Sequence, residues 1–215
     1  MDPPWLPRVA RALTPEPPRG TLPEGASAVL VPLLAGEDEP RILLTLRHHQ
    51  LARHAGQWSF PGGRIETQDK SPAEAALRET EEEVGIPARD VRVLGHLDDY
   101  TTYYGRLVCA YVGEVGPRAP APRIAAPDEV AGLQALRLRD FLDPGRYEGR
   151  CLPQGQVRGE DRVVHYWHFG GVPIWGITAE LLARFLTRAY GWSPPSPPRV
   201  IGSVAEFRDL ARRGL

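Results

Sequence analysis

Between Ala73 and Val84 the core-facing positions recur at helical spacing, and the sequence marks both ends of the predicted helix. The recurring residues are Ala73, Ala76, Leu77, Thr80 and Val84. Before them, Ser71-Pro72-Ala73-Glu74 has the order of an N-cap, a first-turn proline and the acid of a capping box. Gly85 is the residue type at which helices commonly end. The pattern therefore predicts a helix between Ser71 and Gly85.

Four glutamates crowd the last two turns of this helix, where the helix dipole disfavours negative charge. Each exposed acid there costs roughly 0.3 to 1 kcal/mol, and like charges repel. At about 100° per residue, Glu79, Glu82 and Glu83 fall on one arc of roughly 100°, whereas Glu81 projects to the opposite side. Three converging carboxylates predict a site for Mg²⁺ or Mn²⁺, which prefer oxygen ligands. A solvated acidic helix end is the alternative interpretation.

Along the rest of the chain, strands are followed and flanked by helices, which predicts an α/β fold. Two aliphatic runs predict a hairpin of residues 28–34 and 41–46, with Pro32 placing its first strand at a sheet edge. Further strands are predicted at 91–97, 107–115, about 133–138 and around Tyr166 and Trp167, and a second long helix at about 178–190. Turn residues predict loops at 47–63, 116–127 and 143–161.

The chain is expected to form one domain at residues 26–191 with two flanking segments. Residues 1–25 are an N-terminal extension, and residues 192–215 combine a proline-rich linker with a C-terminal helix. That helix begins at Ser203, which forms a second capping box with Glu206. Its apolar stripe consists of Val204, Phe207, Leu210 and Ala211. We expect the stripe to dock on its own domain, and an arm of a homodimer is the alternative.

Composition restricts the classes of partner. The formal net charge is −1 over 215 residues, so no general basic field recruits nucleic acid or an acidic membrane. No apolar run approaches membrane-spanning length, and residues 1–20 lack the apolar core of a signal peptide. The 2 cysteines lie far apart, which favours a reducing compartment. We therefore expect a cytoplasmic protein with a small-molecule partner.

The acidic helix belongs to a longer pattern that resembles the Nudix box. The pattern is Gly63-x5-Asp69-x8-Arg78-Glu79-Thr80-Glu81-Glu82-Glu83-Val84-Gly85-Ile86. In its usual form the box is G-x5-E-x7-R-E-U-x-E-E-x-G-U, where U is bulky and aliphatic. Asp69 here replaces a glutamate, the spacer before Arg78 is one residue longer, and Thr80 takes an aliphatic position. Because the helical carboxylates all match, the resemblance implies a Nudix-type α/β/α sandwich with a mixed β-sheet.

Three further segments are similar to the coenzyme A diphosphatase branch of that family. Residues 43–63 resemble its signature LLTxR[SA]xxxRxxxGxxxFPGG, although His48 and Ala52 depart from it and Arg53 stands one position after the expected second arginine. Glu66-x-x-Asp69 resembles its D-x-x-D, and Ile174-Trp175-Gly176-Ile177-Thr178-Ala179 resembles its IWGxTA segment. The matches span residues 43–179.

The resemblance implies a role for each matching residue. Glu79, Glu82 and Glu83 are expected to bind the metal, and Glu129 is expected to add a carboxylate from a distant loop, with a solvated loop acid as the alternative. Arg78 is expected to orient the neighbouring carboxylates, against the simpler interpretation of a surface salt bridge. Which group acts as the general base stays open.

Other residues are expected to contact the substrate. Gly62 and Gly63 let backbone approach a diphosphate, although a tight turn also explains this pair. Arg47 and Arg53 are candidates for holding a terminal phosphate through bidentate hydrogen bonds. The aromatic and imidazole side chains are interpreted mainly as structural, with base stacking or phosphate contact as alternatives: His48, His49, His54, Tyr100, Tyr103, Tyr104 and Trp175.

These observations predict a Mg²⁺-dependent (or Mn²⁺-dependent) hydrolase that splits coenzyme A or its thioesters into 4′-phosphopantetheine and adenosine 3′,5′-bisphosphate. The nearest alternative keeps the chemistry and changes the substrate to ADP-ribose, a dinucleotide or a nucleoside triphosphate, because His48 and Ala52 depart from the signature. A non-catalytic sensor of nucleotide ligands is the alternative from another class. Loss of helical carboxylates would mark such a sensor, and all three are present.

Overall fold

The computed structural model describes residues 2–17, 20–36, 38–51, 54–102, 105–152 and 162–200. Within these residues, seven strands form a mixed main sheet whose central order is β3-β2-β1-β6-β5, with β4 also pairing with β1 and β7 with β2. The β1–β6 pair is parallel and the other pairs are antiparallel. The strands are β1 (Ser27–Leu34), β2 (Arg41–Arg47), β3 (Trp58–Ser59), β4 (Gly62–Arg64), β5 (Val91–Thr101), β6 (Leu107–Val115) and β7 (Val130–Arg137).

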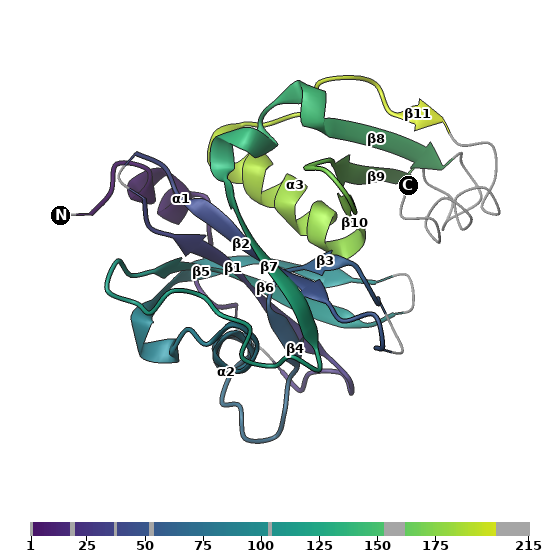
Figure 1. Ribbon diagram of the computed structural model, residues 1–215. Helices are drawn as coiled ribbons and strands as arrows, with labels where there is room; N and C mark the ends of the chain where they lie inside the picture. Colours follow the sequence, from purple (N-terminus) through teal and green to yellow (C-terminus); the bar gives the residue numbers. More distant parts are fainter. Residues whose placement is uncertain are drawn as a thin grey trace.

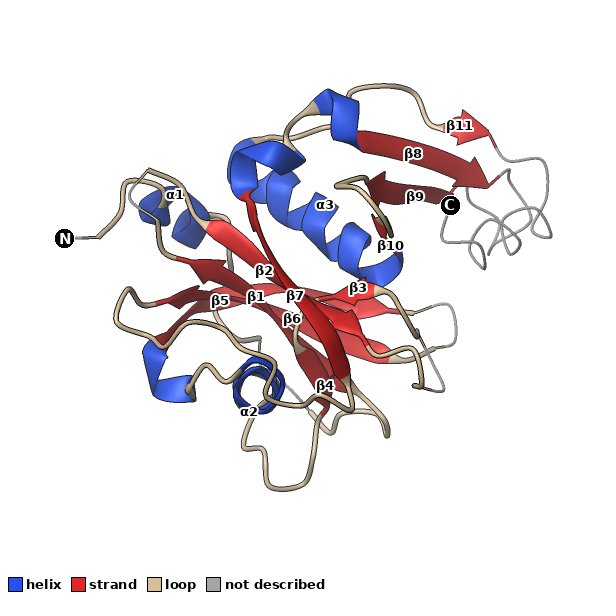
Figure 2. Ribbon diagram, in the orientation of Figure 1, coloured by secondary structure: helices blue, strands red, loops and turns tan. Residues whose placement is uncertain are grey.

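Helices cover both faces of the main sheet (Figures 1 and 2). On one face lies α2 (Pro72–Val84), and on the other lie α1 (Leu6–Arg11) and α3 (Gly176–Tyr190). Because successive strand residues point to opposite faces, Leu30 of β1 packs towards α2 while Val31 packs towards α3. The sheet thus divides the apolar core into two layers, which confirms the predicted α/β/α arrangement with a mixed sheet.

A second sheet packs on the far side of α3 (Figure 1). Its order is β10-β9-β8-β11, formed by β10 (Ile174–Trp175), β9 (Arg162–Trp167), β8 (Tyr147–Leu152) and β11 (Arg199–Val200). The prediction of a turn-rich loop at 143–161 is wrong for β8. In this strand the buried Arg150 guanidinium donates two hydrogen bonds, of 2.7 and 3.0 Å, to the half-buried Glu148 carboxylate. A charged pair thus stands where most strands show apolar alternation.

Pro32 was expected at a sheet edge, and this prediction is wrong because β1 pairs with β6 along its whole length. On its other side β1 changes partner, from β4 at residues 27–29 to β2 at residues 33–34. The Leu30 N–H bonds to the Pro61 carbonyl on that side, and the nitrogen of Pro32 points the same way. The missing N–H therefore falls in the gap between two partner strands, where no ladder bond is lost.

The predicted helix ends agree with the structure. The Ser71 hydroxyl accepts a hydrogen bond of 3.2 Å from the Glu74 N–H, and Gly85 ends α2 with a φ of 68°. The Glu74 carboxylate accepts from the Lys70 N–H at 2.6 Å, one residue before the partner in a standard capping box. The second predicted helix appears as α3, two residues longer at its start.

Both flanking segments contribute to the fold. Trp5, Leu6 and Val9 around α1 are buried in the core beneath α3. After α3, Trp192 packs against the second sheet and β11 joins it. The predicted helix from Ser203 lies outside the described residues. None of the helices in the described part of the chain has the length and apolarity that crossing a membrane requires.

Candidate active site

The last two turns of α2 bring the predicted carboxylates together at the side of β4 and β1. Glu83 is only 4% exposed, whereas the Glu82 side chain is 56% exposed. Glu81 is exposed on another side of the helix, where its carboxylate accepts a hydrogen bond of 3.1 Å from the Ala88 N–H. The predicted separation of Glu81 from the other three glutamates is therefore confirmed.

Arg78 binds three carboxylates at once. Its Nε and Nη2 donate to the two oxygens of Asp69, each at 3.1 Å, and its Nη1 donates to Glu79 and Glu82, each at 3.0 Å. Nη2 also donates to the Arg64 carbonyl at 3.0 Å. The Asp69 side chain is only 2% exposed, and the Arg78 hydrogen bonds hold the pKa of this carboxyl below its ordinary value. Arg78 is thus embedded in a network rather than in a single surface salt bridge.

Glu83 is a buried carboxyl in a surplus of negative charge. Burial raises its pKa to about 8, and the nearby carboxylates of Glu79 and Glu129 act in the same direction. Arg47, at the end of β2, and the Gly62 N–H partly oppose this shift. Among the described residues, Glu83 Oε2 and Arg47 Nε are both buried without a hydrogen-bond partner. Two unpartnered buried groups of opposite charge indicate a place for a ligand.

A chain of backbone hydrogen bonds links Glu83 to Glu129 and to His48, the residue after Arg47. The Ala125 N–H donates to the Glu83 carbonyl at 3.0 Å, and the Glu129 N–H donates to the Ala126 carbonyl at 3.0 Å. On its other side, the Glu129 carbonyl accepts from the His48 N–H at 2.7 Å. The segment 116–127, which has no helix or strand as predicted, therefore ties the end of α2 to the start of β7.

Gly62 and Gly63 lie in β4, so the prediction of a loop through 47–63 is wrong at β3 and β4. Neither glycine sits in a tight turn. Gly62 has a φ of 152°, and a Cβ there would overlap the Ala28 carbonyl. A Cβ at Gly63 would overlap the Glu79 carboxylate. The missing side chain of Gly62 therefore lets β4 lie close to β1, and that of Gly63 lets the Glu79 carboxylate of α2 approach the sheet.

The remaining candidates separate into packing residues and residues outside the described part of the chain. Tyr100 is buried in the core, and Trp175 stacks on Tyr166 with 6.2 Å between ring centroids. His48 stacks on His49 at 4.5 Å, while His54 is within 3.0 Å of the Gln57 side chain. Arg53, Tyr103 and Tyr104 lie outside the described residues.

The fold also brings together two segments that are far apart in sequence. The Thr178 hydroxyl, in the first turn of α3, donates to the Trp58 carbonyl of β3 at 3.2 Å. Residues 174–179 thus contact residues 43–63, the two regions whose sequences resemble the coenzyme A diphosphatase branch. The local sequence pattern does not predict this contact, because the two residues are 120 positions apart.

The carboxylates are ligands of the type that a divalent cation prefers, but they do not converge in a ligating geometry. In the described residues, no three His, Cys, Asp or Glu side chains converge as closely as metal ligands do. Glu79 and Glu82 are instead paired with Arg78. The unpartnered Glu83 oxygen and its acidic neighbours provide the hard oxygen donors that Mg²⁺ or Mn²⁺ requires.

Residues 25–162 match the family model of the NUDIX domain. The chain belongs to the Nudix hydrolase family. It is 40% identical over 158 residues to an uncharacterised Nudix hydrolase, NudL, of Yersinia enterocolitica, covering 74% of this chain and 78% of the relative. It is 36% identical over 182 residues to a NudL of Escherichia fergusonii, covering 85% and 91%.

A solved structure supports the fold alone. It is a MutT/nudix family protein from Enterococcus faecalis, with a TM-score of 0.51 and 17% identity over 82% of this chain and 65% of that chain. As a Nudix hydrolase the protein acts on phosphoanhydride bonds, and members of this family typically use divalent metal ions.

The sequence pattern identified the carboxylates of α2 but not the backbone groups of Ala125 and Ala126 that connect Glu83 to Glu129. Nothing about Ala125 or Ala126 distinguishes them from other loop alanines, because only their N–H and carbonyl groups take part. Two pockets among the described residues, about 240 and 280 Å³ in volume, are lined by residues other than Glu83 and Arg47. The carboxylate site is recognised from charge and burial.

Proposed function

We propose that this Nudix hydrolase is a Mg²⁺-dependent or Mn²⁺-dependent diphosphatase that cleaves coenzyme A or its thioesters into 4′-phosphopantetheine and adenosine 3′,5′-bisphosphate. The observation that carries the proposal is the buried Glu83 carboxyl, which has an unpartnered oxygen and lies among Glu79, Glu129 and Arg47. Such a group needs either a proton or a cation.

In this proposal the side chains divide the work between cation and substrate. Glu79, Glu82, Glu83 and Glu129 hold the cation, and Arg78 orients Glu79 and Glu82 through its hydrogen bonds. A bound divalent ion would neutralise the diphosphate and lower the pKa of the attacking water. Arg47 turns its unpartnered Nε to a phosphate oxygen. Gly63, which has no side chain, lets the Glu79 carboxylate lie against the backbone of β4, where it can take part in holding the cation.

The choice of coenzyme A rests on sequence resemblance and on one contact. The LLTxR-type segment and the IWGxTA-type segment meet through Thr178 and Trp58, with Arg47 at the end of the strand that pairs with β3. Their contact supports a shared part in recognising one substrate.

A screen by mass spectrometry tests the proposal. Purified full-length protein is incubated with coenzyme A, ADP-ribose, NADH and nucleoside triphosphates, each with Mg²⁺ or Mn²⁺. Coenzyme A is expected to have the highest kcat/KM and to yield adenosine 3′,5′-bisphosphate. A higher kcat/KM for ADP-ribose or a dinucleotide would refute the substrate assignment, while absence of turnover with every compound would favour a sensor.

One observation favours the alternative substrates. His48 takes a position where the branch signature has a small residue, and its ring stacks on His49. This departure from the signature favours a different nucleoside diphosphate derivative, such as ADP-ribose, as the alternative substrate.

A further inference from the structure

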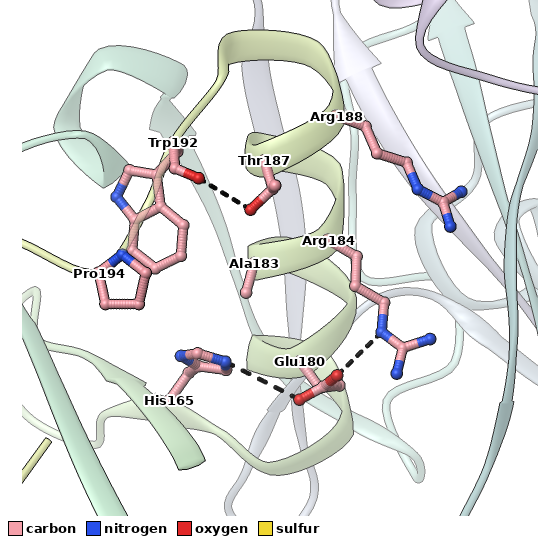
Figure 3. Close-up of a pocket in the computed structure, with 8 residues that line it drawn as sticks. All are labelled: His165, Glu180, Ala183, Arg184, Thr187, Arg188, Trp192 and Pro194. Carbon is pink, nitrogen blue, oxygen red and sulfur yellow. Dashed lines mark hydrogen bonds and ion pairs between the residues drawn. The ribbon is translucent and has the colours of Figure 1, made fainter.

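A pocket of about 240 Å³ lies between α3 and the segment that follows it (Figure 3). Its lining includes Trp192 and Pro194, the α3 residues Glu180 and Ala183, and His165 of β9. Since α3 and α2 cover opposite faces of the main sheet, this pocket is separate from the carboxylate site (Figure 1).

One wall of the pocket is the apolar indole of Trp192, which is held in place. The backbone N–H of Trp192 donates to the Leu186 carbonyl at 3.3 Å, and the backbone carbonyl of Trp192 accepts from the Thr187 hydroxyl at 2.9 Å. The indole also meets the rings of Tyr147 and Trp167, with centroids 5.1 and 5.4 Å away. Such a preformed aromatic wall suits a planar ring, because little side-chain freedom is lost on binding.

Two polar groups face each other in the pocket at ion-pair distance but without a hydrogen bond (Figure 3). His165 Nε2 and Glu180 Oε2 are 3.9 Å apart, longer than the roughly 2.7 to 3.2 Å of a hydrogen bond. Each group is anchored by its other polar atom. The second Glu180 oxygen accepts from Arg184 Nε at 2.8 Å, and His165 Nδ1 lies 2.8 Å from the Tyr147 hydroxyl.

The neutral form of His165, with its proton on Nε2, places a hydrogen-bond donor beside the Glu180 acceptor. Burial lowers the pKa of His165 below its ordinary value, so the imidazole is neutral near pH 7. The nearby Glu180 carboxylate favours the proton on Nε2, and Nδ1 then accepts from the Tyr147 hydroxyl. The pocket therefore presents an N–H donor next to a carboxylate acceptor.

The arginines at the rim are already occupied. In Figure 3 the guanidinium groups of Arg184 and Arg188 point away from Trp192. Both bind Asp98 of β5, at 2.6 and 3.1 Å, and Arg188 also donates to the Leu97 carbonyl. The pocket offers no spare guanidinium for a phosphate group.

We propose that this pocket binds an adenine-type base, a planar ring with an amino group beside a ring nitrogen. The ring stacks on Trp192, the amino group donates to Glu180, and the ring nitrogen accepts from His165. A volume of about 240 Å³ holds one such ring system rather than a dinucleotide, since sites for drug-sized ligands begin near about 300 Å³. The bound base would join α3 to residues 192–194 as a second, non-catalytic ligand site.

Calorimetric titration of metal-free, full-length protein with adenosine tests this proposal. Adenosine has no phosphate, and inosine is the matched control because its base has a carbonyl and an N–H where adenosine has the amino group and the ring nitrogen. We expect adenosine to bind, and inosine to bind at least about 10-fold more weakly because two hydrogen bonds are mismatched. His165→Phe and Glu180→Ala should each weaken adenosine binding about 3- to 10-fold, the effect of one lost hydrogen bond.

Glu82→Gln is the control for the carboxylate site and should leave adenosine binding unchanged. Glu180 is partly exposed, so Glu180→Ala keeps the test valid even if His165→Phe disturbs folding. The proposal is overturned if adenosine does not bind at millimolar concentration, if inosine binds equally well, or if Glu82→Gln abolishes binding while Glu180→Ala does not.

Discussion

The two long helices carry ion networks on opposite faces of one sheet, and the networks differ in charge balance. On α3, Arg184 and Arg188 face Glu180 and Asp98, so that two cations meet two anions. On α2, one guanidinium serves three carboxylates, Asp69, Glu79 and Glu82. Glu83 adds a fourth acid with an unpartnered oxygen.

The difference separates a structural network from a site that needs a ligand. A balanced network on a partly exposed helix adds roughly 0 to 1 kcal/mol per pair, and its charges need no further counter-ion. An acidic surplus around a buried carboxyl costs stability until a proton or a cation enters. The networks should therefore respond in opposite ways to mutation.

The largest expected effect is the loss of activity when one of the excess carboxylates of α2 is removed. Glu83→Gln and Glu82→Gln should each lower kcat on the order of 100-fold or more, because removal of groups that only orient metal ligands already costs about 10- to 100-fold. Steady-state kinetics at saturating Mg²⁺ measures this. Glu81→Gln on α2 and Glu180→Gln on α3 are controls and should retain most activity. Near-normal kcat in both site variants would refute the site.

Stability of the metal-free protein should depend on pH through Glu83. Its pKa is raised from 4.5 to about 8, so the folded state holds the proton more tightly than the unfolded state does. The stabilisation is complete below pH 4.5 and is lost as pH rises towards 8, by about 2 to 4 kcal/mol. Urea unfolding with EDTA at pH 5.5 and pH 8 should show this loss in the wild type and a smaller one in Glu83→Gln. Equal losses in both proteins would contradict it.

Arg47, whose buried Nε has no hydrogen-bond partner among the described residues, should affect substrate choice. The arginines of α3, which pair with Asp98, should not. Arg47→Ala should lower kcat/KM for coenzyme A more than for dephospho-coenzyme A, by about 1.5 to 3 kcal/mol, if Arg47 binds the 3′-phosphate. Arg184→Ala should leave the ratio of the two substrates unchanged. Equal slowing of both substrates by Arg47→Ala would show that this arginine does not contact the 3′-phosphate.

Breaking the chain of backbone hydrogen bonds at the α2 site should have a slightly smaller effect. Ala125→Pro removes the N–H that binds the Glu83 carbonyl, so kcat should fall about 10-fold while the protein stays folded. Ala125→Gly keeps the N–H and should preserve kcat, and Ala121→Pro tests proline elsewhere in the same loop. If Ala121→Pro lowers kcat as much as Ala125→Pro, the effect belongs to the loop as a whole.

The smallest effect is expected from the balanced network. Arg184→Ala should lower the free energy of unfolding by about 1 kcal/mol or less, because the Arg184 side chain is 33% exposed and solvent screens its ion pairs. Its kcat should match that of the wild type. Denaturant unfolding and kinetics on the same preparation check both statements, and a marked loss of kcat would mean that α3 takes part in catalysis.

Local signals predicted α2 well because all of them lie within a few residues. The cap at Ser71, the stop at Gly85 and the glutamate spacing depend on backbone geometry that the helix itself imposes. The same reasoning failed at Pro32 and at β8. In both cases a strand distant in sequence decides the outcome, through the gap between β4 and β2 beside Pro32 or through the pairing of β8 with β9.

By itself the sequence determined the helix, the direction of its carboxylates, the α/β class and the family, since these follow from residue type and spacing. Only the tertiary structure decided that Glu83 is buried beside Arg47, and that Glu129 is tied to it through Ala125. The same holds for the pocket on α3, whose walls come from β9, α3 and the segment after it. Burial and backbone hydrogen bonds between distant segments depend on the packing of the whole chain, and local residue patterns do not encode them.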